Sequence, residues 1–124
     1  MDTRRKILGW SDARALLEAA GAPLVTGYFD PLTADHARRL AELAETHGPL
    51  FVLVLDPPDA VLPAGARAEL VASLGCVKCI VLPPPEGVEA VLEAVGEGRL
   101  LREEAADLER RAALTRHVHA RHAS

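Results

Sequence analysis

Residues 23–36 read PLVTGYFDPLTADH, and the fold of the chain can be worked outward from this stretch. Its apolar first part, from Pro23 to Tyr28, is typical of a short buried strand. Pro31 closes that strand and opens a helix, because apolar residues recur at helical spacing after it. A strand that turns directly into a helix is the building unit of parallel α/β sheets. The apolar side of this helix carries Leu32, Ala37, Leu40, Leu43 and Ala44.

The alternation of strands and helices extends over the rest of the chain. Ser11 or Asp12 can cap a helix that Gly21 ends, and Pro63 fits the first turn of another helix. Residues 50–55 form a continuous apolar run, as in strands that are covered on both faces. Further helices are expected over residues 88–95 and 99–121, and a further strand over residues 77–82.

Short connections between alternating elements imply right-handed crossovers and a parallel sheet. We therefore predict one domain over residues 1–124, a three-layer α/β sandwich with a three-stranded parallel sheet and a long C-terminal helix. Three strands leave a narrow sheet with exposed edges, so a homodimer is also predicted. The C-terminal helix would use an apolar stripe to cover the sheet or to meet a partner, and this stripe includes Leu100, Leu101, Leu108 and Leu114.

Composition and charge narrow the possible partners. Of the 124 residues 49% are apolar, and the formal net charge is −4. Lys and Arg residues are scattered among carboxylates, whereas a nucleic-acid-binding protein usually shows a concentrated basic face. Apolar runs are much shorter than the roughly 20 residues needed to cross a bilayer. With two cysteines and no apolar export signal, we expect a cytoplasmic protein that binds neither nucleic acid nor membranes.

The strand end at residues 27–36 is the predicted binding site. In an open parallel sheet, ligands bind beyond the carboxyl ends of the strands, where the strand order reverses. Gly27 lets a ligand approach the backbone closely, and free amides at the start of the following helix can bind phosphate oxygens. His36 lies just inside that helix, close enough to donate to the same phosphate. The sequence therefore predicts a phosphate site at this turn.

Four residues of the turn, Gly27, Phe29, Asp30 and His36, match the spacing of the signature G-x-F-D-x-x-H-x-G-H. In this the chain resembles the nucleotidyltransferase (cytidylyltransferase-like) superfamily, above all its heptose 1-phosphate adenylyltransferase and glycerol-3-phosphate cytidylyltransferase types. The similarity extends over roughly residues 6 to 85. It includes the Lys-Ile-Leu segment at residues 6–8, a polar loop after Leu55, a helix with Arg67-Ala68-Glu69-Leu70, and the strand that holds Ile80, Val81 and Leu82.

The resemblance implies an activity and a set of site residues. A phosphorylated sugar or polyol would attack the α-phosphorus of ATP or CTP, and pyrophosphate would leave. Mg²⁺ would bridge the phosphates, without a metal held tightly by the protein itself. His36 and Thr33 would occupy the catalytic positions of the motif. The residues that would contact the nucleotide or its phosphates are Gly27, Tyr28, Phe29, Asp30 and Arg67.

Departures from the signature indicate impaired catalysis. Thr33 stands where the family has its first histidine, and it can donate a hydrogen bond but cannot be cationic. Asp35 replaces the motif glycine and would repel a triphosphate unless a metal ion or an arginine screens it. The basic loop of the family is replaced by Asp56-Pro57-Pro58-Asp59. Thr115 and Arg121 are a possible remnant of the family's last phosphate-binding segment.

Three functions remain open at this point. The first is an adenylyl- or cytidylyltransferase, and the second is a non-catalytic descendant that binds a nucleotide or serves as an interaction module. The third is a subunit that works with a separately encoded kinase. The motif turn supports all three, because ancestry from a phosphate site does not require present catalysis.

Other reactive residues receive structural interpretations. Cys76 and Cys79 lie between a helix end and a strand, which does not suit a redox pair, and zinc would need further ligands. His117, His119 and His122 fit a solvated basic helix end better than a metal site, because no nearby carboxylate completes a ligand set. The charged run from Glu103 to Arg111 is interpreted as a solvated helix face with helix-spaced ion pairs.

Overall fold

The computed structural model describes the backbone of residues 3–123 and the side chains of residues 3–118. It is an α/β sandwich around a five-stranded sheet in the order β1-β4-β3-β2-β5, in which all neighbouring strands are parallel. The strands are β1 (Ile7–Gly9), β2 (Leu24–Gly27), β3 (Leu50–Val54), β4 (Val77–Leu82) and β5 (Leu100–Arg102). The helices are α1 (Trp10–Ala20), α2 (Ala34–His47), α3 (Ala64–Ala72), α4 (Val88–Val95) and α5 (Glu104–Ala123), with short 3-10 turns at Thr3–Lys6 and Glu97–Arg99.

Strand β2 lies where the strand order reverses. The chain passes from β2 to β3 on one side, and it later returns to place β5 on the other side of β2. Val25 is aligned with Val52 of β3 and with Leu101 of β5. The carboxyl ends of β2 and β5 therefore flank the position at which open α/β sheets bind ligands.

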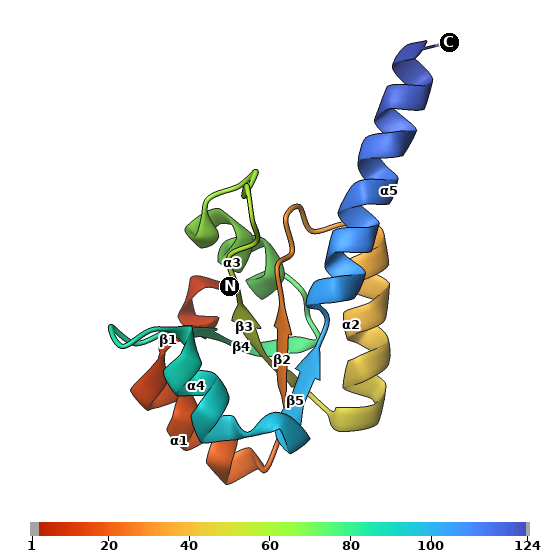
Figure 1. The fold of residues 1–124 in the computed structure, drawn as a ribbon. Coiled ribbons are helices and arrows are strands. Elements are labelled where there is room, and N and C mark those ends of the chain that lie inside the picture. Colours follow the sequence, from red (N-terminus) through yellow and green to blue (C-terminus); the bar gives the residue numbers. More distant parts are fainter. Residues whose placement is uncertain (1–2, 124) are drawn as a thin grey trace.

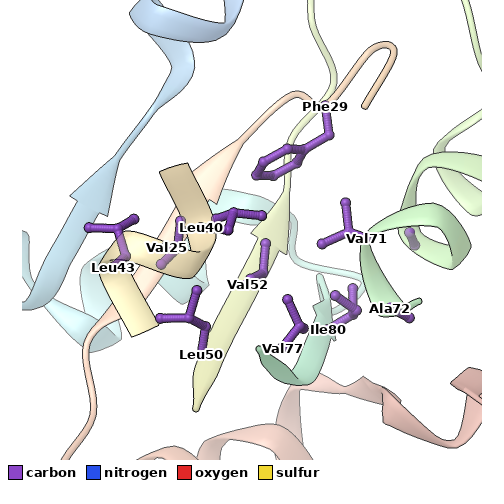
Figure 2. Packing of buried hydrophobic residues seen from close by; sticks show 11 residues of the cluster. Val25, Phe29, Leu40, Leu43, Leu50, Val52, Val71, Ala72, Val77 and Ile80 are labelled. Atoms are coloured by element: carbon purple, nitrogen blue, oxygen red, sulfur yellow. The ribbon is translucent and has the colours of Figure 1, made fainter. Parts of the chain in front are cut away.

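Helices cover both faces of the sheet, which gives three layers (Figure 1). One core lies between the sheet and helices α1 and α4, and it includes Leu17, Phe51 and Val91. The other core lies between the sheet and helices α2 and α3 (Figure 2). In β3 Phe51 points to the first core and Val52 to the second, so the continuous apolar run at residues 50–55 is explained by burial on both faces.

The prediction of a three-stranded sheet is wrong, because the sheet has two further edge strands. Strand β1 pairs with β4, and β5 pairs with β2. Each edge strand has three residues, too few for a period-2 pattern to distinguish it from its neighbours. Leu100 and Leu101 also continue the helical spacing of Leu108, so the sequence favours a helix where pairing with β2 produces a strand.

Helix α5 consequently begins later than residue 99, and it does not cover the sheet with an apolar stripe. Leu108 and Leu114 are 42% and 40% exposed. Among the described side chains of α5, residues 104–118, only Asp107 is buried. The helix starts beside α2 and then projects away from the sandwich (Figure 1). None of the described helices is long and apolar enough to span a membrane.

Candidate functional site

The turn after β2 directs two consecutive backbone amides toward one point. Phe29 has a φ of 51°, in the left-handed region that residues other than glycine rarely adopt. A backbone bend of this type makes a small anion-binding concavity, because neighbouring N–H groups converge. The amides of Tyr28 and Phe29 form this concavity at the carboxyl end of β2.

The carboxylate of Asp107, from the first turns of α5, occupies the concavity. Its Oδ2 accepts hydrogen bonds from the amide of Tyr28 at 2.7 Å and from that of Phe29 at 3.4 Å. Its Oδ1 lies 2.9 Å from Nε2 of His36 and accepts a hydrogen bond from Nη1 of Arg110 at 3.0 Å. We call the two amides, the imidazole and the guanidinium the strand-end nest. The turn therefore binds an anion, and in this structure the chain supplies it.

Gly27 makes the close approach of Asp107 possible. A Cβ atom at this position would lie 2.6 Å from Oδ2 of Asp107 and 2.8 Å from the ring of Phe29. Both separations are shorter than real Cβ contacts, so a side chain at residue 27 would push the carboxylate out of the nest or displace the ring. The motif glycine was expected to admit a ligand, and here it admits a side chain of the same protein.

His36 is held so that one ring nitrogen faces the anion. The amide of Thr33 donates to Nδ1 of His36 at 3.0 Å, which completes a capping box at the start of α2. Because Nδ1 accepts, the proton of the neutral ring is assigned to Nε2. The imidazole is 3% exposed and lies against the ring of Phe29, with 5.6 Å between the ring centroids.

The Nε2 donor of His36 is incompletely satisfied. Its nearest acceptor is Oδ1 of Asp107, but the contact lacks the geometry of a hydrogen bond, and no other hydrogen-bond partner is present among the described residues. We therefore treat it as an electrostatic contact. Buried polar atoms without a partner are rare and call for a physical explanation. Here a buried donor points at an anion site whose present occupant does not satisfy it.

Arg110 links the nest to Asp35. Its Nε donates to Oδ2 of Asp35 at 2.7 Å, while its Nη1 donates to Asp107. The hydrogen bond from Arg110 lowers the pKa of Asp35 below its usual value, and a weaker contact with Arg38 acts in the same direction. Asp35, which replaces the motif glycine, is therefore screened by an arginine. On the basis of the sequence, a triphosphate can bind only with such screening, by an arginine or a metal ion.

Other predicted site residues lie at the turn but do not face the anion. The hydroxyl of Thr33 lies 2.7 Å from Nδ1 of His36 and caps the amide of that residue. The carboxylate of Asp30 is buried and accepts from the amides of Val61 and Leu62 at 2.6 and 2.8 Å. The ring of Phe29 belongs to the core beneath α2 and α3 (Figure 2).

Arg67 is buried, and its hydrogen bonds connect two loops. Its guanidinium is 1% exposed and donates to the carbonyls of Leu62, Tyr28 and Leu55 at 3.1, 3.1 and 2.6 Å. It also pairs with the exposed carboxylate of Asp56 at 2.6 Å. These bonds join the ends of β2 and β3 to the start of α3. In this arrangement the N–H groups of Arg67 are used by the chain, so the residue positions the turn and does not face the anion.

The possible C-terminal remnant lies farther along α5. Thr115 is exposed, and its hydroxyl donates to the carbonyl of Arg111, while the side chain of Arg121 lies outside the described part. Thr115 lines an apolar groove of about 290 Å³ that adjoins the turn at Pro31 and also includes Val61 and Val118. A larger hollow of about 560 Å³ lies beside α3 and contains none of the predicted site residues.

Sequence reasoning missed Asp107 and Arg110. The run from Glu103 to Arg111 was interpreted as a solvated helix face, but Asp107 is 3% exposed. The one sequence feature that could have indicated these residues is their spacing of three, which allows an ion pair on one face of a helix. Its meaning depends on strand β5, because only the pairing of β5 with β2 brings the start of α5 to the turn.

The remaining reactive side chains lie away from the nest. Burial raises the pKa of the Cys79 thiol to about 11, which keeps it protonated and unreactive at neutral pH. Within the described side chains, no three His, Cys, Asp or Glu residues come together as metal ligands would. His117 is exposed on α5, whereas the side chains of His119 and His122 lie outside the described part.

No protein-family model matches the sequence, and a comparison with curated proteins finds no match either. The resemblance to nucleotidyltransferases therefore stays a prediction from the motif at the turn after β2.

Proposed function

We propose that the protein is a nucleotidyltransferase-like domain that binds a phosphate-bearing nucleotide at the strand-end nest and has impaired transferase activity. The observation that carries this proposal is the convergence of two backbone amides, a buried imidazole and an arginine on one anion. Groups of these types bind phosphate oxygens in other proteins. The location supports it too, since β2 lies where the strand order reverses.

Impaired catalysis follows from what surrounds the nest. Thr33 is used in capping α2, so His36 is the single motif side chain directed at the anion. Loss of one transition-state donor in such sites typically costs about 100- to 1,000-fold in rate. Glu103 and Glu104 also lie at the ends of β2 and β5, where Glu103 pairs with Arg39 and Glu104 pairs with Arg102. These carboxylates lower the attraction for a triphosphate.

The transfer itself would rely on positioning. ATP or CTP would bring Mg²⁺ bound to its phosphates, and the described residues do not form a three-ligand metal site of their own. Nε2 of His36 and the amides of Tyr28 and Phe29 would bind phosphate oxygens while a phosphorylated sugar or polyol attacks the α-phosphorus. The groove beside Pro31 adjoins the turn and could receive the rest of the ligand.

Calorimetry and pyrophosphate release test this function together. Titration with ATP or CTP in Mg²⁺ should give binding, and turnover with sugar phosphates should be slow or absent. His36→Ala should abolish the binding. His47→Ala is the matched control, because that histidine lies exposed at the far end of the same helix and should leave binding unchanged. Equal binding by wild type and His36→Ala would contradict the proposed site.

A non-catalytic interaction module is the second candidate. It is favoured by a specific observation, namely that Asp107 occupies the nest and α5 projects from the sandwich (Figure 1). This hypothesis is distinguished from the first by nucleotide binding. An interaction module would bind neither ATP nor CTP, even when Asp107 is neutralised. A homodimer remains part of this prediction, and sedimentation at micromolar concentration would test it.

A further inference from the structure

We propose that Asp107 is an intramolecular substitute for the phosphate of a ligand, so that the nest is autoinhibited and opens when a phosphate-bearing ligand displaces the start of α5. This inference rests on the proposed function and adds its regulation. Closed and open forms would exchange in solution, and the ligand would bind the open form alone.

Asp107 and a bound phosphate exclude each other. Oδ2 of Asp107 uses both amides of the turn, and Oδ1 uses Arg110. The space above Gly27 is filled, since even a Cβ atom there would meet Oδ2 at 2.6 Å. A second anion would also repel the buried carboxylate at short range. A ligand can therefore enter only if Asp107 leaves, and Asp107 is carried by α5.

Helix α5 is attached to the sandwich in a manner that allows it to leave. Asp107 is the one buried side chain among residues 104–118. The other hydrogen bonds that attach α5 and the residue before it are polar side-chain contacts. They join Arg110 to Asp35, Arg111 to the carbonyls of Pro58 and Asp59, Glu103 to Arg39, and Glu104 to Thr26. Water can replace each of these bonds at little net cost, whereas buried apolar area would resist separation.

The nest suits a phosphate better than its present occupant. Asp107 leaves Nε2 of His36 without a hydrogen bond, although the imidazole is 3% exposed and points at the carboxylate. Oδ1 of Asp107 could accept a second hydrogen bond, but the amides and Arg110 fix the plane of the carboxylate, and in this position Oδ1 and Nε2 lack the geometry of a hydrogen bond. A phosphate offers at least three oxygens in a tetrahedral arrangement, so one more is available for Nε2. The unsatisfied Nε2 of His36 is therefore explained if a phosphate replaces Asp107 in the nest.

The competition reduces affinity in a measurable way. When the binding-competent form is a minor population, the apparent dissociation constant rises in inverse proportion to that population. Asp107→Asn keeps the size of the side chain but removes its charge, and its NH2 group must face either the two amides or Arg110, which are all donors. It should open the nest and strengthen the binding of inorganic pyrophosphate by at least about tenfold. Glu109→Gln removes an exposed carboxylate from the same helix and should leave the affinity unchanged.

Hydrogen exchange of the amides of α5 provides an independent readout in the wild type. Saturating pyrophosphate should accelerate exchange in residues 104–118, because it displaces the helix, whereas ligands usually slow exchange. In Asp107→Asn, exchange there should be fast with or without pyrophosphate. Should that variant fail to fold, the wild-type exchange alone decides: acceleration supports the displacement, and slower or unchanged exchange at saturation overturns it.

The outcomes separate this inference from the function on which it rests. Weak binding by wild type and tight binding by Asp107→Asn support autoinhibition. Equal affinities with no change in α5 overturn autoinhibition while the phosphate site stands. If neither protein binds pyrophosphate, ATP or CTP at millimolar concentration and Asp107→Asn is folded, both the proposed function and this inference are rejected.

Discussion

Helices α1 to α4 and helix α5 attach to the same sheet by different means. The first four bury apolar side chains such as Leu17, Leu40, Val71 and Val91 against it. In α5 the only buried side chain among residues 104–118 is the carboxylate of Asp107. The rest of the helix makes polar contacts with the sandwich and includes partly buried alanines, Ala106 and Ala112. Apolar burial is lost only on unfolding, whereas a buried anion can be exchanged for another anion. This difference is the reason for proposing α5 as the element that a ligand displaces.

Deleting apolar atoms from the packed core and from α5 should change the unfolding free energy by very different amounts, and this is the largest effect that we expect. Leu53→Ala removes a fully buried side chain from the core between the sheet and helices α1 and α4 and should cost about 2–5 kcal/mol of unfolding free energy. Leu114→Ala, on the projecting part of α5, should change it by less than about 0.5 kcal/mol. Urea unfolding followed by circular dichroism measures both. Similar losses at the two sites would show that α5 belongs to the packed core.

Arg67 tests whether the turn itself belongs to the rigid region. Arg67→Met should cost about 3 kcal/mol, since it leaves three partly buried carbonyl groups without their donor. Arg38→Met, at an exposed arginine, is the control and should have little effect. A variant that keeps its stability but loses pyrophosphate binding would instead assign Arg67 to the ligand.

Gly27→Ala probes the contact between the two regions. The added methyl group would lie 2.6 Å from Oδ2 of Asp107, so the variant should lose about 1–3 kcal/mol and show faster hydrogen exchange in α5. Gly65→Ala is a suitable control, because a Cβ there meets no atom within 4 Å. It should be neutral or stabilise α3 by about 0.5–1 kcal/mol. Unchanged exchange in the α5 of Gly27→Ala would break the proposed link.

Asp35 should give the smallest effect, and its dependence on pH identifies the cause. Hydrogen bonding to Arg110 holds the folded-state pKa of Asp35 below the unfolded value of about 3.9. The ionised carboxylate of Asp35 therefore stabilises the fold above about pH 4, and this stabilisation is lost as the pH falls through the lowered pKa. The melting temperature of Asp35→Asn should lie slightly below that of wild type at pH 7, and the difference should be smaller at about pH 3. An equal difference at both pH values would point to packing.

Prediction from sequence was most successful where a pattern is long or chemically specific. The three central strands, the first helix and the helix at residues 88–95 follow apolar patterns, and the structure confirms them. The predicted cap of the first helix is wrong, because Gly9 is the N-cap residue and Ser11 and Asp12 lie inside the first turn. Gly21 ends α1 with a φ of 61°, as expected for a glycine at a helix end. The second helix begins at Ala34 instead of Pro31, because Thr33 and His36 form the cap. Short edge strands carry no comparable signal.

The candidate site was found only in part for a related reason. Gly27, Tyr28, Phe29 and His36 belong to one turn, so their cooperation is a local property that a motif can express. Asp107 reaches them from 71 residues beyond His36, through the pairing of β5 with β2. The sequence contains no local sign that this particular carboxylate, among 18 acidic residues, becomes buried.

By itself the sequence determined the parallel α/β arrangement and a turn able to bind an anion, because apolar periodicity and local backbone chemistry act between neighbouring residues. Tertiary structure alone decided which anion the turn holds, which donors Arg67 uses, and where α5 begins. These outcomes depend on which strands become neighbours. Residues distant in the chain then compete for the same few hydrogen-bonding groups, and burial makes each choice energetically significant.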